Sequence, residues 1–292
     1  MSIRTLLLVR FIFFLVISLL TGASCSLNTV YSNLDYLIPA YIDNLVDLDE
    51  LEDRADSETI LLLIWHQKHQ LPKYNQFLTE IKYIVSSENN KKIQSEEILL
   101  YLQKTSSLWH QMRAQLSIHL AELLPLLSTD QIQELFASLE ENNEKFIKTN
   151  IGLDKNEQVE IYDERLISNF EDWFGYLTKE QRKQLSKAAK EFQSLSRQRL
   201  TARLEWQQQT KKLLFSDEPD KTKLLLKLFN RLSLKHDNLY ANINAINRKV
   251  LITILSYTFK TLEIQQKRHL VNKLDDYIEL IDSFKKHKWI QE

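Results

Sequence analysis

The sequence predicts an all-α protein: an elongated antiparallel bundle of about eight helices that follows an N-terminal signal segment. The composition gives two reasons. The 292 residues include only three glycines and four prolines, far below the roughly 7% and 5% of average usage, so turns are few. Leucine, lysine, glutamine and glutamate are abundant instead, and these residues favour long amphipathic helices.

A recurring signature of helix starts gives the third reason. Residues 177–181 combine Leu177, which can pack back on the helix, with the N-cap Thr178 and with Gln181 three residues later, which can close a capping box. Residues 127–131 repeat this pattern with serine, and weaker echoes without a Ser/Thr cap occur at 48–52 and 262–266. We therefore expect helix pairs that begin with one shared motif.

The first 24 residues are expected to form a signal peptide of the lipoprotein type. Arg4 and Arg10 precede or flank an apolar run that ends at Leu20, and small residues follow. This is the layout of a secretory signal, and the run is too short for a comfortable membrane span. The sole cysteine, Cys25, comes next, and an unpaired cysteine in an exported protein requires an explanation.

Lipidation of Cys25 supplies that explanation, because the segment resembles a bacterial lipobox. We therefore expect Cys25 to carry acyl chains such as palmitate and to hold the protein to a membrane. Ser26, rather than aspartate, follows the cysteine, which by analogy with known sorting rules indicates an outer-membrane anchor facing the periplasm. The alternatives are ordinary cleavage after Ala23, which leaves Cys25 free, and an uncleaved N-terminal anchor.

Two long helices are expected first in the mature chain. Residues 48–85 carry apolar side chains at spacings of three and four, with a kink at 69–72 where Pro72 removes a helical hydrogen bond. After a polar loop at 86–93, residues 95–127 repeat the apolar spacing. Because only a short loop separates them, these two helices should pack antiparallel.

The remaining helices follow in order. Turn signals at 150–152, Gly175 and 216–219 divide the rest of the chain. We expect helices at 128–148, 154–175, 178–215, 220–236, 239–262 and 263–287. Residues 25–292 should form a single helical domain; if there are two lobes, the joint lies near Gly152, at 150–154.

The start of the mature chain resembles a known family. Residues 31–43 contain the order Tyr, x, Asn, Leu, Asp, aromatic, Leu, and then a second aromatic and an acid, and a Trp-His pair precedes Leu-Pro-x-Tyr at 65–74. This order is similar to that of an uncharacterised family of Gram-negative envelope lipoproteins. The resemblance implies a location and a helical fold but no activity. The matching residues are Tyr31, Asn33, Leu34, Asp35, Tyr36, Leu37, Tyr41, Asp43, Trp65, His66, Leu71, Pro72 and Tyr74.

Few residues suggest catalytic chemistry. His66 and His69 share a helix face and could grip a metal, but no zincin pattern surrounds them, so a surface pair is the simpler interpretation. An acidic tract at 35–58 could supply paired carboxylates, but a solvated acidic surface near the anchor is the much simpler interpretation, because no defined cleft is indicated. We find no phosphate loop, GxSxG, dinucleotide turn or CxxC. We therefore expect no enzyme activity, no cofactor and no metal.

Charge is distributed unevenly. Residues 179–212 hold ten basic and three acidic side chains, whereas residues 40–60 hold eight acids and one arginine. Either the two regions face one another or solvent, or the first forms a cationic binding surface. Without residues 1–24 the chain has 36 basic and 39 acidic side chains, so nucleic acid is not an expected partner. The candidate binding residues are Lys179, Arg182, Lys183, Lys187, Lys190 and Arg197.

These observations favour a lipid-anchored, non-enzymatic envelope protein that binds protein partners or unfolded clients through helical surfaces. The motif at 177–181 is similar to the repeats of Spy-like periplasmic chaperones, which cradle unfolded clients, although the motif is short and this chain is about twice as long as expected for them. The alternative is a cell-wall glycan hydrolase of the envelope. An open groove of basic and apolar residues would favour binding, and a pocket with convergent carboxylates would favour hydrolysis.

Overall fold

The computed structural model describes residues 24–48, 51–87, 93–231, 238–287 and 289, and its regular elements there are all helices, which confirms the all-α prediction. The signal segment expected at 1–24 lies almost entirely outside the described residues. The elements are α2 (Ser24–Ser32), α3 (Leu34–Asp43), α4 (Glu52–Trp65), the π-helix η2 (His66–Gln70), α5 (Leu71–Ser86), α6 (Ser95–Leu123), the 3-10 turn η4 (Leu124–Leu126), α7 (Thr129–Asn150), α8 (Lys155–Phe174), α9 (Lys179–Glu191), α10 (Ser196–Leu214), α11 (Lys221–Arg231), α12 (Asn238–Lys260) and α13 (Ile264–Phe284).

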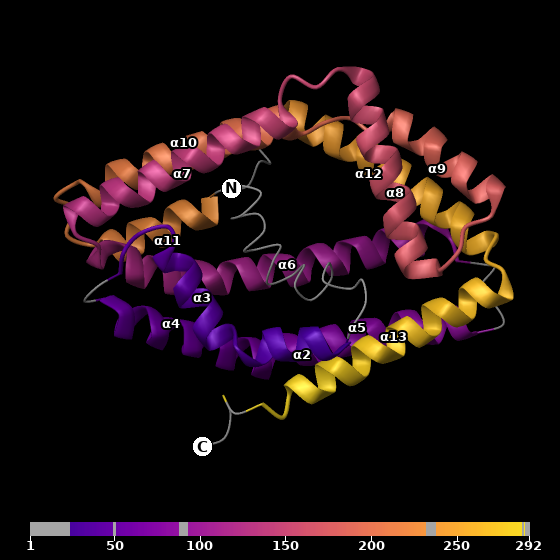
Figure 1. The fold of residues 1–292 in the computed structure, drawn as a ribbon, viewed down its shortest axis with the longest axis horizontal. Coiled ribbons are helices and arrows are strands. Elements are labelled where there is room, and N and C mark those ends of the chain that lie inside the picture. Colours follow the sequence, from indigo (N-terminus) through magenta and orange to yellow (C-terminus); the bar gives the residue numbers. More distant parts are fainter. Residues whose placement is uncertain (1–23, 49–50, 88–92, 232–237, 288, 290–292) are drawn as a thin grey trace.

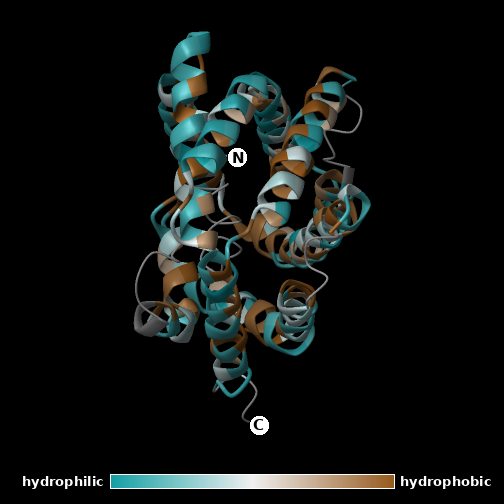
Figure 2. Cartoon of the chain, turned by 90° about the vertical axis from the view of Figure 1, so that its right-hand side faces the viewer, coloured by the Kyte–Doolittle hydropathy of each residue, from teal (hydrophilic) through white to brown (hydrophobic). Residues whose placement is uncertain are grey.

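The helices form an elongated assembly around α6, which runs along much of its length (Figure 1). On one side of α6, α11 packs on α6 and α7 packs on α10. Toward the other end of α6, α9 packs on α8 and on α12. Opposite them, α5 packs on α13. In Figure 2 the hydrophobic stretches lie mainly where helices face one another, so burial of apolar faces holds the layers together.

The described part contains more helices than the expected eight, partly because two long helices are divided. The first division is the π-helix η2 between α4 and α5. It ends just before Pro72, which occupies the first turn of α5, where a missing N–H costs little. The kink predicted at 69–72 therefore appears as a π-helical segment. Beyond it, α5 and α6 are antiparallel as expected, since Gln70 contacts Leu108 and Glu80 pairs with Lys104.

The second division corrects the prediction of one helix over 178–215. The chain leaves the helix at Phe192, whose ψ is 139°, and resumes it at Ser196. Asn247 of α12 satisfies the open backbone: Gln193 N–H donates to Asn247 Oδ1 at 2.9 Å, and Asn247 Nδ2 donates to the Gln193 carbonyl at 2.8 Å. Because this contact joins residues 54 positions apart, local sequence patterns do not indicate it.

The capping boxes form where the sequence predicts them. Gln181 N–H donates to Thr178 Oγ1 at 3.2 Å, and Thr178 N–H donates to Gln181 Oε1 at 2.9 Å. Ser128 and Gln131 make the equivalent pair at the start of α7. Leu177 is buried beside this helix start, so both local parts of the motif are confirmed.

The two full copies of the motif, at 127–131 and 177–181, each contact a partial copy that lacks the Ser/Thr cap. Gln131 Nε2 donates to the Asp47 carbonyl at 2.7 Å, and Asp47 directly precedes the partial copy at 48–52. Gln181 and Gln266, buried at 1% and 0% exposure, exchange two hydrogen bonds of 3.1 and 2.8 Å between their side-chain amides. The motif therefore joins helix starts that are far apart in the chain, besides capping each one.

Candidate functional site

The basic face of α9 consists of Lys179, Arg182, Lys183, Lys187 and Lys190. All five side chains are exposed. At about 100° per residue they cover roughly 140° of the helix circumference, opposite the buried Gln181, Leu185, Ala188 and Ala189. The cations therefore share one solvent-facing surface, as the spacing predicts. Their local charge is partly balanced, since Arg182 pairs with Glu171 and Lys183 lies 3.8 Å from Glu180.

Other members of the predicted basic region lie elsewhere. Arg197 is exposed, but it belongs to α10, beyond the break. Arg203 is 3% exposed; it stacks on Phe146 at 4.5 Å, and burial lowers the pKa of its guanidinium to about 10. Leu204, which the spacing places inward, is instead 45% exposed. The exposed basic face of α9 is therefore shorter than the region of positive charge in the sequence.

The acidic tract does not cover the basic face. α9 packs on α8 and α12, whereas α3 and α4, which carry most described acids of the tract, pack on each other, and α4 packs on α6. Figure 1 places α3 and α4 at the end of the molecule away from α9. The tract therefore does not face α9, and this part of the basic region faces solvent. A solvated surface and a cationic binding surface both agree with this arrangement.

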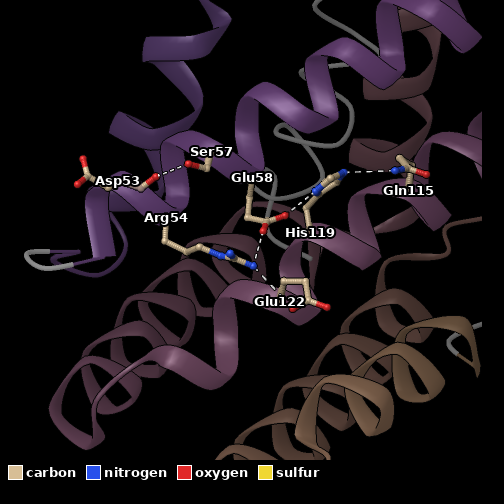
Figure 3. A network of polar contacts seen from close by, with 7 residues as sticks. All are labelled: Asp53, Arg54, Ser57, Glu58, Gln115, His119 and Glu122. Carbon is tan, nitrogen blue, oxygen red and sulfur yellow. Dashed lines mark hydrogen bonds and ion pairs between the residues drawn. The ribbon is translucent and has the colours of Figure 1, made fainter.

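One acid of the tract, Glu58, is buried rather than solvated. Its carboxylate accepts a hydrogen bond from His119 Nδ1 at 2.8 Å and pairs with Arg54 at 2.6 Å (Figure 3). Gln115 Nε2 lies 3.3 Å from His119 Nε2. Since an amide nitrogen can only donate, His119 Nε2 accepts and Nδ1 keeps the proton that it shares with Glu58. The cluster therefore links α4 to α6.

The cluster also holds a second carboxylate, Glu122, which lies 3.7 Å from Arg54 (Figure 3), and neither of its two carboxylates lines the cavity described below. A carboxylate that orients a histidine activates a nucleophile only when the other ring nitrogen reaches that nucleophile, and here an amide occupies the site. A glycosidase needs two carboxyl groups facing its substrate. His119 does not line that cavity either. The geometry thus gives no support to the glycan hydrolase considered from the sequence.

A partly open cavity of about 440 Å³ lies among α2, α5, α6, α8, α12 and α13. Its volume is within the roughly 300–1,000 Å³ of small-molecule sites. The lining is almost wholly apolar and includes side chains such as Leu78, Ile81, Leu102, Leu274 and Ile281. Sequence reasoning missed this cavity, because the apolar stripes that line it look the same as stripes that close on a packed core.

Polar groups gather at one end of the cavity. His66 is 3% exposed, and its Nδ1 lies 3.3 Å from the Tyr31 hydroxyl. Burial lowers the pKa of His66 to about 4 and raises the pKa of Tyr31 and Tyr74. His66 Nε2 has no hydrogen-bond partner among the described residues. Four residues of the family resemblance, Tyr31, Leu34, His66 and Tyr74, line the cavity.

His66 and His69 do not form the surface pair that the sequence favours. His69 is exposed, but His66 turns inward to the cavity, because the π-helical segment carries them in different directions. Within the ranges that the structure describes, no group of three or more His, Cys, Asp or Glu side chains could hold a metal ion. None of the described helices has a stretch long and apolar enough for a membrane span.

Comparisons with known proteins place the chain in a family without a known activity. No curated protein and no solved structure matches it. One family model matches residues 41–239, about two thirds of the chain, from α3 to the start of α12. The matched part contains α9, the Glu58–His119 cluster and the wall of the cavity formed by α5, α6 and α8. The chain therefore belongs to the family of unknown function DUF6279.

Proposed function

We propose that this protein is a lipid-anchored, non-enzymatic component of the cell envelope that binds protein partners or unfolded clients. The basic face of α9 is the docking surface. The observation that carries the proposal is that five cations on one face of α9 are all exposed and are opposed there by few acids. Such a face attracts anionic partners over a Debye length of about 8 Å at physiological salt.

The anchor in this proposal is a lipidated Cys25 that keeps the body at the periplasmic surface of the outer membrane. The apolar run before Cys25 and the resemblance to envelope lipoproteins support it. The similarity of the helix-start motif to Spy-like chaperones supports unfolded clients as partners. Cys25→Ala should move the protein from the membrane to the soluble fraction; a variant that stays on membranes after a high-salt wash contradicts the anchor.

The experiment that tests the docking surface reverses three charges. Lys183, Lys187 and Lys190 are changed together to glutamate, and binding to an acidic unfolded client is measured at rising salt. The wild type should lose affinity for the client as salt rises. The triple variant should bind at least about tenfold more weakly at low salt, because three charges that attract the acidic client are replaced by three that repel it.

A matched control carries the same change of charge elsewhere. Lys148, Lys155 and Lys212 are exposed and lie on α7, α8 and α10. Their replacement by glutamate should leave client binding near the wild-type value, and circular dichroism should show unchanged helicity in both variants. Equal loss in the two triple variants would show that net charge alone governs binding, and unchanged binding in the α9 variant would refute the docking surface.

A further inference from the structure

We propose that the cavity binds the hydrocarbon chain of one acyl lipid with a neutral ester or amide head, and that His66 Nε2 hydrogen-bonds the carbonyl oxygen of that head. This lipid site goes beyond the proposed function. It requires neither the α9 docking surface nor a lipid on Cys25.

The shape of the cavity fits one extended chain. Its lining runs along α5 from Tyr74 to Val85 and along α6 from Glu97 to Leu108. Eleven residue steps of a helix cover about 16 Å, so a volume of about 440 Å³ corresponds to a cross-section of roughly 27 Å². If a methylene group takes about the 30 Å³ of a water molecule, the cavity has room for roughly fifteen. The stretch of helix that it follows and its volume therefore both agree with the size of one fatty acyl chain.

The charges around the cavity select against an ionised head group. Among the residues that the structure describes, no lysine or arginine belongs to the lining, and the one carboxylate there, Glu97, is exposed. A free fatty acid would place its carboxylate among apolar side chains without a cation, which is costly. An ester or amide carries no charge but keeps a carbonyl oxygen that accepts hydrogen bonds. The lining therefore favours an esterified or amide-linked acyl chain.

His66 supplies the matching donor. When the Tyr31 hydroxyl donates to His66 Nδ1, the single proton of the neutral ring lies on Nε2. This N–H is buried and has no partner among the described residues. Buried donors are almost always satisfied, and a lipid carbonyl at this end of the cavity would satisfy this one.

Two sources could supply this chemistry. α2 contributes Leu27 and Tyr31 to the lining, and Cys25 lies two residues before Leu27 on the same helix. Acyl chains on Cys25 are therefore one source, and a separate envelope lipid is the other. Both offer ester- or amide-linked chains, so the test must distinguish them.

The test uses the full chain with Cys25→Ala, which carries no acyl group at that position, and titrates it with glycerol monopalmitate. Native mass spectrometry counts bound lipid, and tryptophan fluorescence reports occupancy, since Trp173 lines the cavity. We expect saturable binding of one lipid per chain and weaker binding of ionised palmitate. Leu102→Trp fills the cavity and should weaken binding at least about tenfold. Leu100→Trp, at an exposed position of the same helix, is the control and should bind normally.

A second pair of variants tests the hydrogen bond. His66→Phe should weaken monopalmitate binding about tenfold, whereas His66→Gln, which places an amide donor near the position of Nε2, should recover most of it. The α9 triple variant should bind the lipid unchanged, so failure of the docking surface and failure of the lipid site give different results.

The outcomes separate clearly. Weaker monopalmitate binding by the wild type than by Cys25→Ala would assign the occupant to the Cys25 acyl chains, and equal binding would assign it to a separate lipid; both support the site. Absence of saturable binding, wild-type affinity in Leu102→Trp, or tighter binding of ionised palmitate than of monopalmitate would overturn the proposal.

Discussion

The buried amide pair of Gln181 and Gln266 gives the most decisive test of how the fold is held together. Gln181 Oε1 accepts from Thr178 N–H and from Gln266 Nε2, and Gln181 Nε2 donates to Gln266 Oε1. Gln181→Ala removes these three bonds and the 3.3 Å contacts of Gln181 Nε2 with Thr261. One N–H of the fully buried Gln266 amide then has no partner, although Gln266 keeps its bonds to Tyr176 and Glu263. An unsatisfied buried group costs roughly 1–3 kcal/mol and a lost cap about 1 kcal/mol. We therefore expect the free energy of unfolding to fall by about 3 kcal/mol.

Gln131→Ala is the matched control for this substitution. Gln131 closes the same capping box at α7, but its side chain is only half-buried, so water can replace its long-range bond to the Asp47 carbonyl. Its cost should be about 1 kcal/mol. Urea unfolding followed by circular dichroism measures both values from the midpoint at a constant slope.

A double-mutant cycle isolates the pair itself. Gln181→Ala combined with Gln266→Ala removes both amides, so the unsatisfied partner disappears, and the double variant should be more stable than the sum of the single effects by about 1 kcal/mol or more. Strict additivity, or equal destabilisation by Gln181→Ala and Gln131→Ala, would refute the reasoning that the buried pair joins α9 to α13.

Two further predictions concern stability. Thr178→Ala should lower the free energy of unfolding by about 1 kcal/mol, because α9 loses its N-cap. Lys179→Ala, at the adjacent exposed position, should change this free energy negligibly. Equal effects of the two substitutions in urea unfolding would mean that α9 does not depend on this cap. Acid should destabilise the protein through His66. The pKa of this side chain is about 4 in the fold and 6.5 when it is free, so the unfolded state binds more protons than the folded state between these two values. The free energy of unfolding should therefore fall by about 3 kcal/mol as the pH drops from 6.5 to 4, and it should level off below that. His66→Phe should remove this part of the pH dependence of urea unfolding, and an unchanged slope would contradict a neutral buried His66.

Local sequence determined the helical class and several helix boundaries. A capping box joins residues only three positions apart, so Thr178 with Gln181 and Ser128 with Gln131 could be recognised without knowledge of the fold. The exposed cations of α9 could be predicted for a similar reason, because helical spacing alone places most of them on the side of the helix away from the buried Gln181, Leu185 and Ala188. The kink before α5 could also be predicted from local sequence, since it follows from Pro72.

Tertiary contacts decided the features that bear on function. The break at Phe192 depends on Asn247, the burial of Glu58 depends on His119, and the burial of Arg203 depends on Phe146. In each case the partner is more than 50 positions away, and helical periodicity carries no information about which distant face a helix meets. The cavity around His66 arises in the same way, because apolar stripes fix which sides of the helices turn inward, whereas only the packing of those helices decides whether the space between them is filled or left open.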